Sequence, residues 1–482
     1  MSLPQVIQAG MGANISCPGL VMAAARRGCL GVLSGTALDA VLVGELGLGD
    51  PGGHNLRSVA KFQDLYGFGM DLVEPYYRCG GKAIDEKFLR PFLINRMPPP
   101  IERIKLMILA NYVFVDRAKQ GHSGRVGINY MEEIGRYHLY SMLGAMLAGI
   151  DSIVVGAGIP LQVPDILNKF SRAQKAVYRL PVSGSAEPFP LELDPKEIFP
   201  GLTELKRPDF MPIVSSNALA NILNKKLRGE MAALILEGPS AGGHNASPRE
   251  KGRFNELGEP LYDGPKDYVD EDALLSLGLP VFRAGGQGTR AGLLANLARG
   301  YAGNQIGTRF ALCEESGLEP SIKRTLLDAI YDGTLIVRAD PKASPTGFPF
   351  QVPVIAQSAV NPVVEALRKR ICDLAYLGEY YRKEDGTLGH RCPSEPVNAY
   401  VRKGGKIEDT VGRLCLCNGL MANIGLAQIR AGGAVEPVLP TLGKNVEEDV
   451  RPLLRFHGDS FTADDVIDDL EGKPPRRRQN SP

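Results

Sequence analysis

Eight short apolar runs, each ending in glycine or another small residue, limit what this chain can fold into. The runs show no alternation of polar and apolar residues, which is typical of strands buried on both faces of a parallel sheet. In chain order they span residues 5–12, 29–36, 125–131, 151–160, 211–218, 232–244, 279–288 and 303–310.

Helical patterns separate these runs. Residues 17–28, 137–149, 216–229 and 289–300 carry apolar residues on one face and end at a glycine, a common helix C-cap. The repetition of strand, small-residue loop and helix predicts a TIM (β/α)8 barrel, an α/β fold. An open doubly wound sheet is the alternative.

Two parts of the chain do not fit this repeat. Residues 37–122 lie between the second and third runs, and we interpret them as a helical insertion that forms a cap. Residues 333–482 follow a closing helix and form a cysteine-containing extension with a basic tail, "KPPRRRQNSP". The barrel is then built from residues 1–36 and 123–332. Within the extension, "ASPTGFPF" (343–350) is either a lid over the barrel mouth or a surface crossover.

The composition excludes several classes of protein. The 482 residues carry a net charge of +1, which argues against a dedicated nucleic-acid binder. The N-terminus lacks the features of a secretory signal, and no apolar run is long enough to cross a bilayer. We therefore expect a cytoplasmic protein with reduced thiols. Its partners should be small molecules rather than nucleic acid or membrane, and a homodimer is left open.

The loops after the last two runs predict a phosphate site. In TIM barrels, the loops after strands seven and eight often bind phosphate through backbone N–H groups. Here they contain Gly285 and Gly286 in "AGGQG", and Gly307 and Thr308 in "IGTRF". Thr308 adds a hydroxyl group. The alternative is a pair of tight turns without a ligand.

Further candidates lie at the ends of the first and third runs. Gly10, Met11 and Gly12 end the first run, and Asn129 lies in the third. Met11 could be a core residue, and Asn129 could cap the following helix. Beside a phosphate site, however, an amide can also bond the edge of a heterocycle.

The sixth run ends in "LEGPSAGGHN" (236–245), where His244 directly follows Ala241, Gly242 and Gly243. Either the backbone turns sharply here or a flat ligand lies against it. An imidazole titrates near neutral pH, so His244 suits proton transfer. The alternative is a structural histidine at a turn.

Together, "QAGMG", "VGINY", "AGGH", "AGG" and "IGTRF" resemble, in this order, the nitronate monooxygenases, once called 2-nitropropane dioxygenases. The resemblance covers the first run and residues 123–315, and the long insertion and extension resemble a longer bacterial subgroup. It implies an FMN-dependent TIM-barrel flavoprotein, an oxidoreductase that oxidises alkyl nitronates with O2 through a flavin semiquinone. One alternative is an FMN-dependent enoyl reductase or NAD(P)H-dependent flavin reductase acting on an activated C=C bond or a quinone. A flavin-free phosphate-binding barrel enzyme and a non-catalytic sensor are further alternatives.

The resemblance also implies roles for individual residues. His244 would be catalytic and face the substrate. Gly285, Gly286, Gly307 and Thr308 would hold the FMN phosphate. The remaining cofactor contacts would come from Gly10, Met11, Gly12, Asn129, Glu237, Ala241, Gly242 and Gly243. Relatives often have an acidic residue just before Ala-Gly-Gly-His, where this chain has Ser240. They also often have an aliphatic residue where this chain has Gln287. These departures leave the polarity of the substrate pocket open.

Four cysteines cluster late in the chain, at Cys372, Cys392, Cys415 and Cys417. Four thiols can close a tetrahedral zinc site or hold an iron–sulfur cluster. The spacing lacks two C-x-x-C pairs, however, and buried cysteines are common core residues. A metal here is therefore the weaker of the two hypotheses.

Overall fold

The computed structural model describes residues 3–91, 97–250 and 252–474. Its centre is a closed barrel of parallel strands in the order β1-β11-β10-β8-β7-β4-β3-β2. The predicted TIM barrel is confirmed, and each of the eight apolar runs contributes one strand. The strands are β1 (Val6–Gln8), β2 (Leu30–Ser34), β3 (Val126–Met131), β4 (Ser152–Gly156), β7 (Asp209–Val214), β8 (Leu234–Glu237), β10 (Val281–Ala284) and β11 (Gly303–Ile306).

The interior of the barrel is dry and apolar. Side chains from alternate positions of the strands meet there, including Val32, Val154, Ile235 and Phe282, all fully buried. The other side of each strand packs on helices, so both faces are buried. This is why the runs show no alternation.

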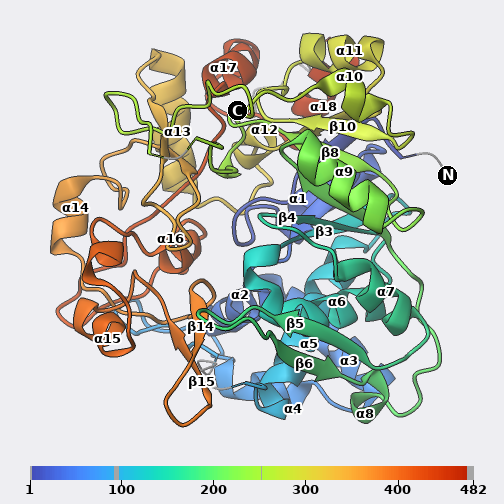
Figure 1. Ribbon diagram of the computed structural model, residues 1–482, viewed down its shortest axis with the longest axis vertical. Helices are drawn as coiled ribbons and strands as arrows, with labels where there is room; N and C mark the ends of the chain where they lie inside the picture. Colours follow the sequence, from blue (N-terminus) through green and yellow to red (C-terminus); the bar gives the residue numbers. More distant parts are fainter. Residues whose placement is uncertain (1–2, 92–96, 251, 475–482) are drawn as a thin grey trace.

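Helices alternate with the barrel strands along the chain, as the repeat predicts, and are labelled in Figure 1. Ser216 and Thr289 cap the helices after β7 and β10, because each side chain accepts a hydrogen bond from a backbone N–H in the first turn. The helices that follow the strands are α1 (Pro18–Arg26), α5 (Ile101–Ala118), α6 (His138–Leu147), α7 (Val163–Ser171), α9 (Asn217–Lys226), α10 (Glu271–Leu275), α11 (Arg290–Arg299), α12 (Thr308–Ala311) and α13 (Pro320–Asp332).

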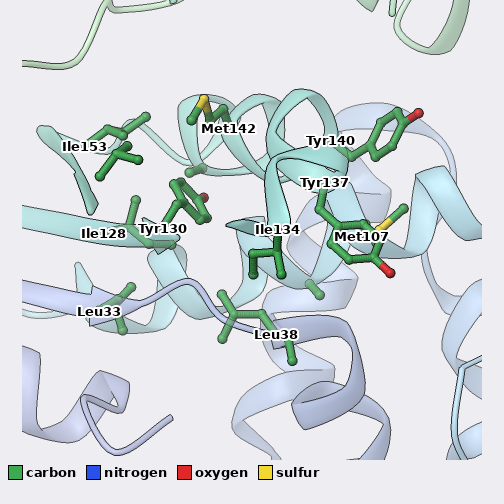
Figure 2. Packing of buried hydrophobic residues seen from close by; sticks show 14 of the residues in the cluster. Leu33, Leu38, Met107, Ile128, Tyr130, Ile134, Tyr137, Tyr140, Met142 and Ile153 are labelled. Atoms are coloured by element: carbon green, nitrogen blue, oxygen red, sulfur yellow. The ribbon is translucent and has the colours of Figure 1, made fainter. Parts of the chain in front are cut away.

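The segment between β2 and β3 is helical. Its last helix, α5, lies against α6 and so belongs to the outer ring of the barrel. The other α-helices of the segment pack against α5. Figure 2 shows Met107 of α5 beside Ile134, Tyr137 and Leu38 in the core that joins this segment to β3. The remaining elements are α2 (Leu38–Gly47), η1 (Pro51–Gly53), α3 (His54–Tyr66), α4 (Met70–Val73) and η2 (Glu74–Tyr76), with η3 (Glu132–Tyr137) directly after β3.

Two excursions from the barrel were not predicted. A hairpin of β5 (Ala176–Leu180) and β6 (Phe189–Leu193), followed by α8 (Pro195–Ile198), lies between β4 and β7. The two-residue strand β9 (Gly243–His244) joins a small sheet in the order β12-β13-β9. The sequence of the hairpin alternates only partly, and nothing local marks β9.

The C-terminal extension returns to the barrel twice. Strand β13 reaches the barrel mouth, and the last two helices pack on α1, α12 and α13. Figure 1 shows the middle of the extension, in orange, beside the barrel. Its elements are β12 (Val337–Asp340), β13 (Phe350–Pro353), α14 (Pro362–Leu367), β14 (Glu379–Arg382), β15 (Leu388–Arg391), α15 (Val397–Arg402), η4 (Ile407–Thr410), α16 (Leu416–Ala422), α17 (Val446–His457) and α18 (Ala463–Glu471).

Most of the basic C-terminal tail that the sequence analysis identified lies outside the described residues. Among the described helices, none combines the length and the apolar character that a membrane span requires.

The contact between α5 and α6 gives a test of the packing. A Cβ at Gly144 would lie 2.1 Å from the carbonyl oxygen of Ile108, so Gly144→Ala should force the helices apart and lower the free energy of unfolding by about 1–3 kcal/mol. Gly47→Ala in α2 is the control, because its nearest neighbour would be Phe88 at 4.0 Å. Urea denaturation measures both. Equal stability of Gly144→Ala and the wild type would contradict this helix contact.

Candidate active site

The pocket at the carboxyl ends of the barrel strands gathers every residue that the sequence predicted for the site. It encloses about 1280 Å³ of empty space, part of it open to solvent. Its lining includes Gly10, Met11, Gly12, Asn129, Glu237, Ala241, Gly242, Gly243, His244, Gly285, Gly286, Gly307 and Thr308. These residues come from β1, β3, β8, β10 and β11, so the barrel brings together segments that are distant in sequence.

Glycines line this pocket where a side chain would not fit or would fill the space. A Cβ at Gly10 would lie 2.5 Å from Cβ of Asn129 and 2.7 Å from the carbonyl oxygen of Leu33. Gly243 has a φ of +87°, and a Cβ there would meet no atom within 4 Å. Gly10 thus allows two strands to approach, whereas Gly243 leaves open space next to His244.

The end of the pocket at β10 and β11 has the features of an anion cradle. Gly285 and Gly286 have φ values of +83° and +67°, which turn the backbone sharply after β10. The hydroxyl oxygen of Thr308 accepts a hydrogen bond from the N–H of Gly443 at 2.9 Å, so its proton remains available to a ligand. Gln305 lines the same pocket, and its buried Oε1 has no hydrogen-bond partner among the described residues.

One acidic side chain at this end was not predicted. Asp449 of α17 lines the pocket, and its Oδ1 accepts a hydrogen bond from the N–H of Gly288 at 3.2 Å. Burial raises the pKa of this carboxyl to about 6, against the opposing effect of Arg309. Asp449 is therefore mostly ionised at neutral pH and close to the loop that would hold an anion.

His244 is held by the extension and not by the barrel alone. Strand β9 pairs with β13, which places His244 opposite Phe350, and the two rings meet edge to face with centroids 5.0 Å apart. The imidazole Nε2 lies 2.7 Å from the hydroxyl oxygen of Ser344. Burial lowers the pKa of His244 to about 4, because the charged imidazolium loses its hydration. The ring is therefore neutral at physiological pH.

Two carboxyl groups near His244 are also buried. Burial raises the pKa of Glu237, at the end of β8, to about 8. It also raises the pKa of Glu133, in η3, to about 8, although the hydroxyl of Thr346 opposes the effect. Oε2 of Glu133 lies 3.8 Å from Nε2 of His244. Glu237 was predicted from the sequence, whereas Glu133 was not.

The extension supplies a wall of the pocket that the sequence did not reveal. Leu416 and Leu420 of α16 and residues 441–443 line the pocket. Thr441 ties this wall to the histidine loop, since its oxygen accepts a hydrogen bond from the N–H of Gly243 at 2.6 Å and its hydroxyl donates to Gln351. The lid alternative for residues 343–350 is supported in part, because Phe350 lines the pocket.

The four late cysteines do come together, around one small cavity of the extension. Burial raises the pKa of each thiol, to about 11 for Cys417, so the thiols are protonated at neutral pH. In the part of the chain that the structure describes, no group of three or more His, Cys, Asp or Glu side chains is arranged to hold a metal ion. Whether these thiols bind a metal stays a prediction.

The fold and this pocket define a TIM barrel with a ligand site at the carboxyl ends of its strands. Residues 200–343 match the sequence model of the nitronate monooxygenase family. This segment carries β7, β8, β10 and β11 with His244 and the anion cradle. The chain is therefore similar to the nitronate monooxygenase family over the second half of the barrel.

Two curated relatives are similar over shorter stretches. A Mycobacterium tuberculosis enzyme named (3aS,4S,5R,7aS)-5-hydroxy-7a-methyl-1-oxo-octahydro-1H-indene-4-carboxyl-CoA dehydrogenase is 43% identical over 65 residues, 14% of this chain and 18% of the relative. A probable nitronate monooxygenase of Bacillus subtilis is 30% identical over 141 residues, 29% of this chain and 38% of the relative. The chain thus matches less than half the length of either relative.

The solved structures that align with the chain are more distant in sequence. FabK from Thermotoga maritima aligns with 97% of this chain and 91% of its own, at 15% identity and a TM-score of 0.47. Nitroalkane oxidase from Streptomyces ansochromogenes aligns with 97% and 95%, at 14% identity and a TM-score of 0.44. The enoyl reductase domain of MlnA from Bacillus amyloliquefaciens aligns with 98% and 94%, at 11% identity and a TM-score of 0.47.

Proposed function

We propose that the protein is an FMN-dependent oxidoreductase that oxidises alkyl nitronates with O2. One pocket of the barrel combines a slot left open at Gly243, the anion cradle after β10 and β11, and the neutral His244. This combination is the observation that carries the proposal. The match of residues 200–343 to the nitronate monooxygenase family supports the same function.

The residues present fit FMN. Gly243 leaves open backbone beside His244, which suits a flat ring system, and Gly242 allows the backbone of Leu442 and Gly443 to approach the loop. Gly285, Gly286, Gly307 and Thr308 provide backbone N–H groups and a hydroxyl for its phosphate. The orphaned Oε1 of Gln305 offers an acceptor for a ligand N–H or O–H. When bound, FMN supplies electron transfer, which no side chain of this pocket can perform.

The charge state of His244 favours a nitronate over a nitroalkane as the substrate. With a pKa of about 4, the imidazole is a weak base, poorly matched to removing a carbon-bound proton at neutral pH. A nitronate has already lost that proton. His244 would then orient the substrate by a hydrogen bond, and the apolar wall of Leu416, Leu420 and Phe350 would exclude water.

A second candidate function is oxidation or reduction of a carbon–carbon bond beside a thioester or ketone. The Mycobacterium tuberculosis relative favours it, because that dehydrogenase acts on a carboxyl-CoA compound by its name. A neutral imidazole can donate a hydrogen bond to such a carbonyl. NAD(P)H as the electron donor and a homodimeric assembly stay predictions under either function.

The first test is the visible absorption spectrum of the freshly purified protein. We expect a yellow protein that releases FMN on denaturation, and nitronate-dependent O2 uptake without NAD(P)H. Anaerobic bleaching by NAD(P)H, with no nitronate oxidation, would favour the second function. A colourless protein that binds no added FMN would contradict both and point to a flavin-free barrel.

Replacing the histidine tests the catalytic assignment. His244→Ala should keep FMN bound, because the cradle and the slot remain, and should lower kcat by about 10²–10⁴-fold. His122→Ala is the control, since His122 bonds the carbonyl of Ala118 at the end of α5, before β3 begins. Steady-state kinetics measures both. Full activity of His244→Ala on every substrate of the wild type would show the assignment to be wrong.

Asp449 gives a prediction for cofactor affinity. Its carboxyl ionises as the pH rises through about 6, so at pH 7.5 it repels the FMN phosphate and at pH 5 it does so much less. Asp449→Asn should therefore bind FMN about 10-fold more tightly than the wild type at pH 7.5, with little difference at pH 5.

Fluorescence titration of the apoprotein measures this change. The phosphate itself titrates near pH 6, but equally for both proteins, so the ratio of the two Kd values isolates Asp449. The exposed neighbour Glu448, changed to Gln, is the control. The same Kd for Asp449→Asn and the wild type at pH 7.5 would place the phosphate elsewhere.

A further inference from the structure

Glu133 is a carboxyl group without a hydrogen-bond partner in a place where burial makes that costly. Its side chain is 10% exposed, and neither oxygen makes a hydrogen bond of regular geometry to a described residue, although the hydroxyl of Thr346 is near enough to oppose the rise in its pKa. The neighbouring carboxyl of Glu132 is different, since it contacts Nε2 of His138 at 2.9 Å and accepts a hydrogen bond from Tyr178 at 3.0 Å. Buried polar groups without partners are rare and commonly have a functional reason.

The polar groups beside Glu133 form a chain that ends at the histidine. Nε2 of His244 lies 2.7 Å from Oγ of Ser344, and this hydroxyl lies 2.9 Å from Oγ1 of Thr346. The hydroxyl of Thr346 is in turn close enough to Glu133 to influence its carboxyl. Oε2 of Glu133 is also 3.8 Å from Nε2, and catalytic hydrogen bonds of this kind are often long before a ligand binds.

The other ring nitrogen, Nδ1 of His244, has no protein partner within the described residues, and His244 lines the main pocket. A neutral imidazole carries its proton on one nitrogen only, and the bond made by one nitrogen decides the state of the other. The group that faces Nε2 therefore decides whether Nδ1 presents a proton or a lone pair to the ligand.

We propose that Glu133 is a positioning residue that sets the tautomer of His244 through the hydroxyls of Ser344 and Thr346. With Glu133 protonated, its O–H donates to Thr346, Thr346 donates to Ser344, and Ser344 donates to Nε2. Nδ1 then carries the proton and faces the ligand as a donor. With Glu133 ionised, each of these hydrogen bonds has the opposite direction: Nε2 donates to Ser344, Ser344 donates to Thr346, and Thr346 donates to Glu133. Nε2 then carries the proton, and Nδ1 faces the ligand with a lone pair.

The same chain can move a proton without charging the imidazole. When Nδ1 gives its proton to a ligand, Nε2 takes one from Ser344, Ser344 takes one from Thr346, and Thr346 takes one from Glu133. Four bonds to hydrogen break and four form, and the negative charge ends on Glu133. The reverse sequence accepts a proton from a ligand. This step uses the pocket of the proposed function and so rests on it, but the tautomer itself does not.

The charge environment fixes the direction of the pH effect. Because burial holds the pKa of Glu133 near 8, we expect the donor tautomer below pH 8 and the acceptor tautomer above it. Among the described residues, the titratable or charged groups near this pair include Glu132 and His138 beside Glu133, Glu237 in the pocket that His244 lines, and Arg413 beside Ser344. Glu132 and His138 bond each other, and Arg413 donates to the carbonyl oxygen of Ser344 at 2.9 Å.

Nitrogen NMR of the protein labelled with [15N]histidine tests the proposal. The chain has six histidines, and His244→Ala assigns the signal. In the wild type at pH 6.5 we expect Nδ1 to have the 15N chemical shift of a protonated nitrogen and Nε2 that of an unprotonated one. At pH 9 we expect the two assignments to be reversed. Glu133→Gln keeps the shape of the side chain but cannot ionise, so the tautomer should stay fixed over this range. Thr346→Val, which removes only the connecting hydroxyl, should also abolish the change.

The matched control is Glu132→Gln, which removes the adjacent carboxyl and should leave the exchange of His244 intact. A wild-type spectrum that does not change, or a change that persists in Glu133→Gln or in Thr346→Val, would overturn the proposal. Folding of each variant is checked by its circular dichroism, and the conservative Glu133→Asp, which restores an ionisable group, should recover the titration.

Kinetics separates this inference from the proposed function. If the wild type turns over a substrate, Glu133→Gln should lower kcat by about 10–100-fold, leave KM nearly unchanged and remove an inflection near pH 8. Turnover with an unchanged pH profile in Glu133→Gln would overturn the inference and leave the function standing. A wild type without flavin would overturn the function, while the NMR result would still decide the inference.

Discussion

The short antiparallel pairing of Gly243 and His244 with Gln351 and Phe350 is the interaction on which the site depends. A histidine on a loop after a barrel strand would otherwise be free to choose among rotamers. The pairing fixes the backbone of the loop, and the hydroxyl of Ser344 and the ring of Phe350 fix the imidazole. Thr441 then holds the N–H of Gly243 from the other side. The extension therefore completes the active site.

The same closure buries the ionisable groups around His244, and this burial controls their charge states. His244, Glu133 and Glu237 are each shifted toward their neutral forms, mainly by desolvation. Neutral groups in a low-dielectric pocket act through directed hydrogen bonds, which are stronger there than in water. At the opposite end, Asp449 is mostly ionised but balanced by the nearby Arg309. The end of the pocket at His244 is thus almost uncharged, whereas the end at Asp449 carries charge.

The sequence was sufficient for the barrel and for the residues that depend on glycine. The repeat of apolar run, small-residue loop and helix can be read directly from the sequence. A positive φ, as at Gly286, or a close approach of two strands, as at Gly10, requires a glycine. The extension has no such repeat, so Leu416, Thr441 and Asp449 could not be assigned to the mouth. Their positions depend on long-range packing. Partial alternation in residues 176–193 likewise left the hairpin β5-β6 unnoticed.

Glu133 shows a different limit of sequence reasoning. Two glutamates follow one another after β3, and composition gives no reason to separate them. One turns toward His138 and Tyr178, and the other turns toward His244. Adjacent residues in a 3-10 helix point in different directions, so only the structure reveals which carboxyl is left without a partner.

The recognised family domain and the rest of the pocket contribute different properties. Residues 200–343 carry His244 and the glycine-containing loops after β10 and β11. Gly10, Asn129 and Glu133 come from the first half of the barrel, and the apolar wall comes from the extension. The groups that face Nε2 of His244, and the apolar side of the pocket, therefore lie outside the matched segment.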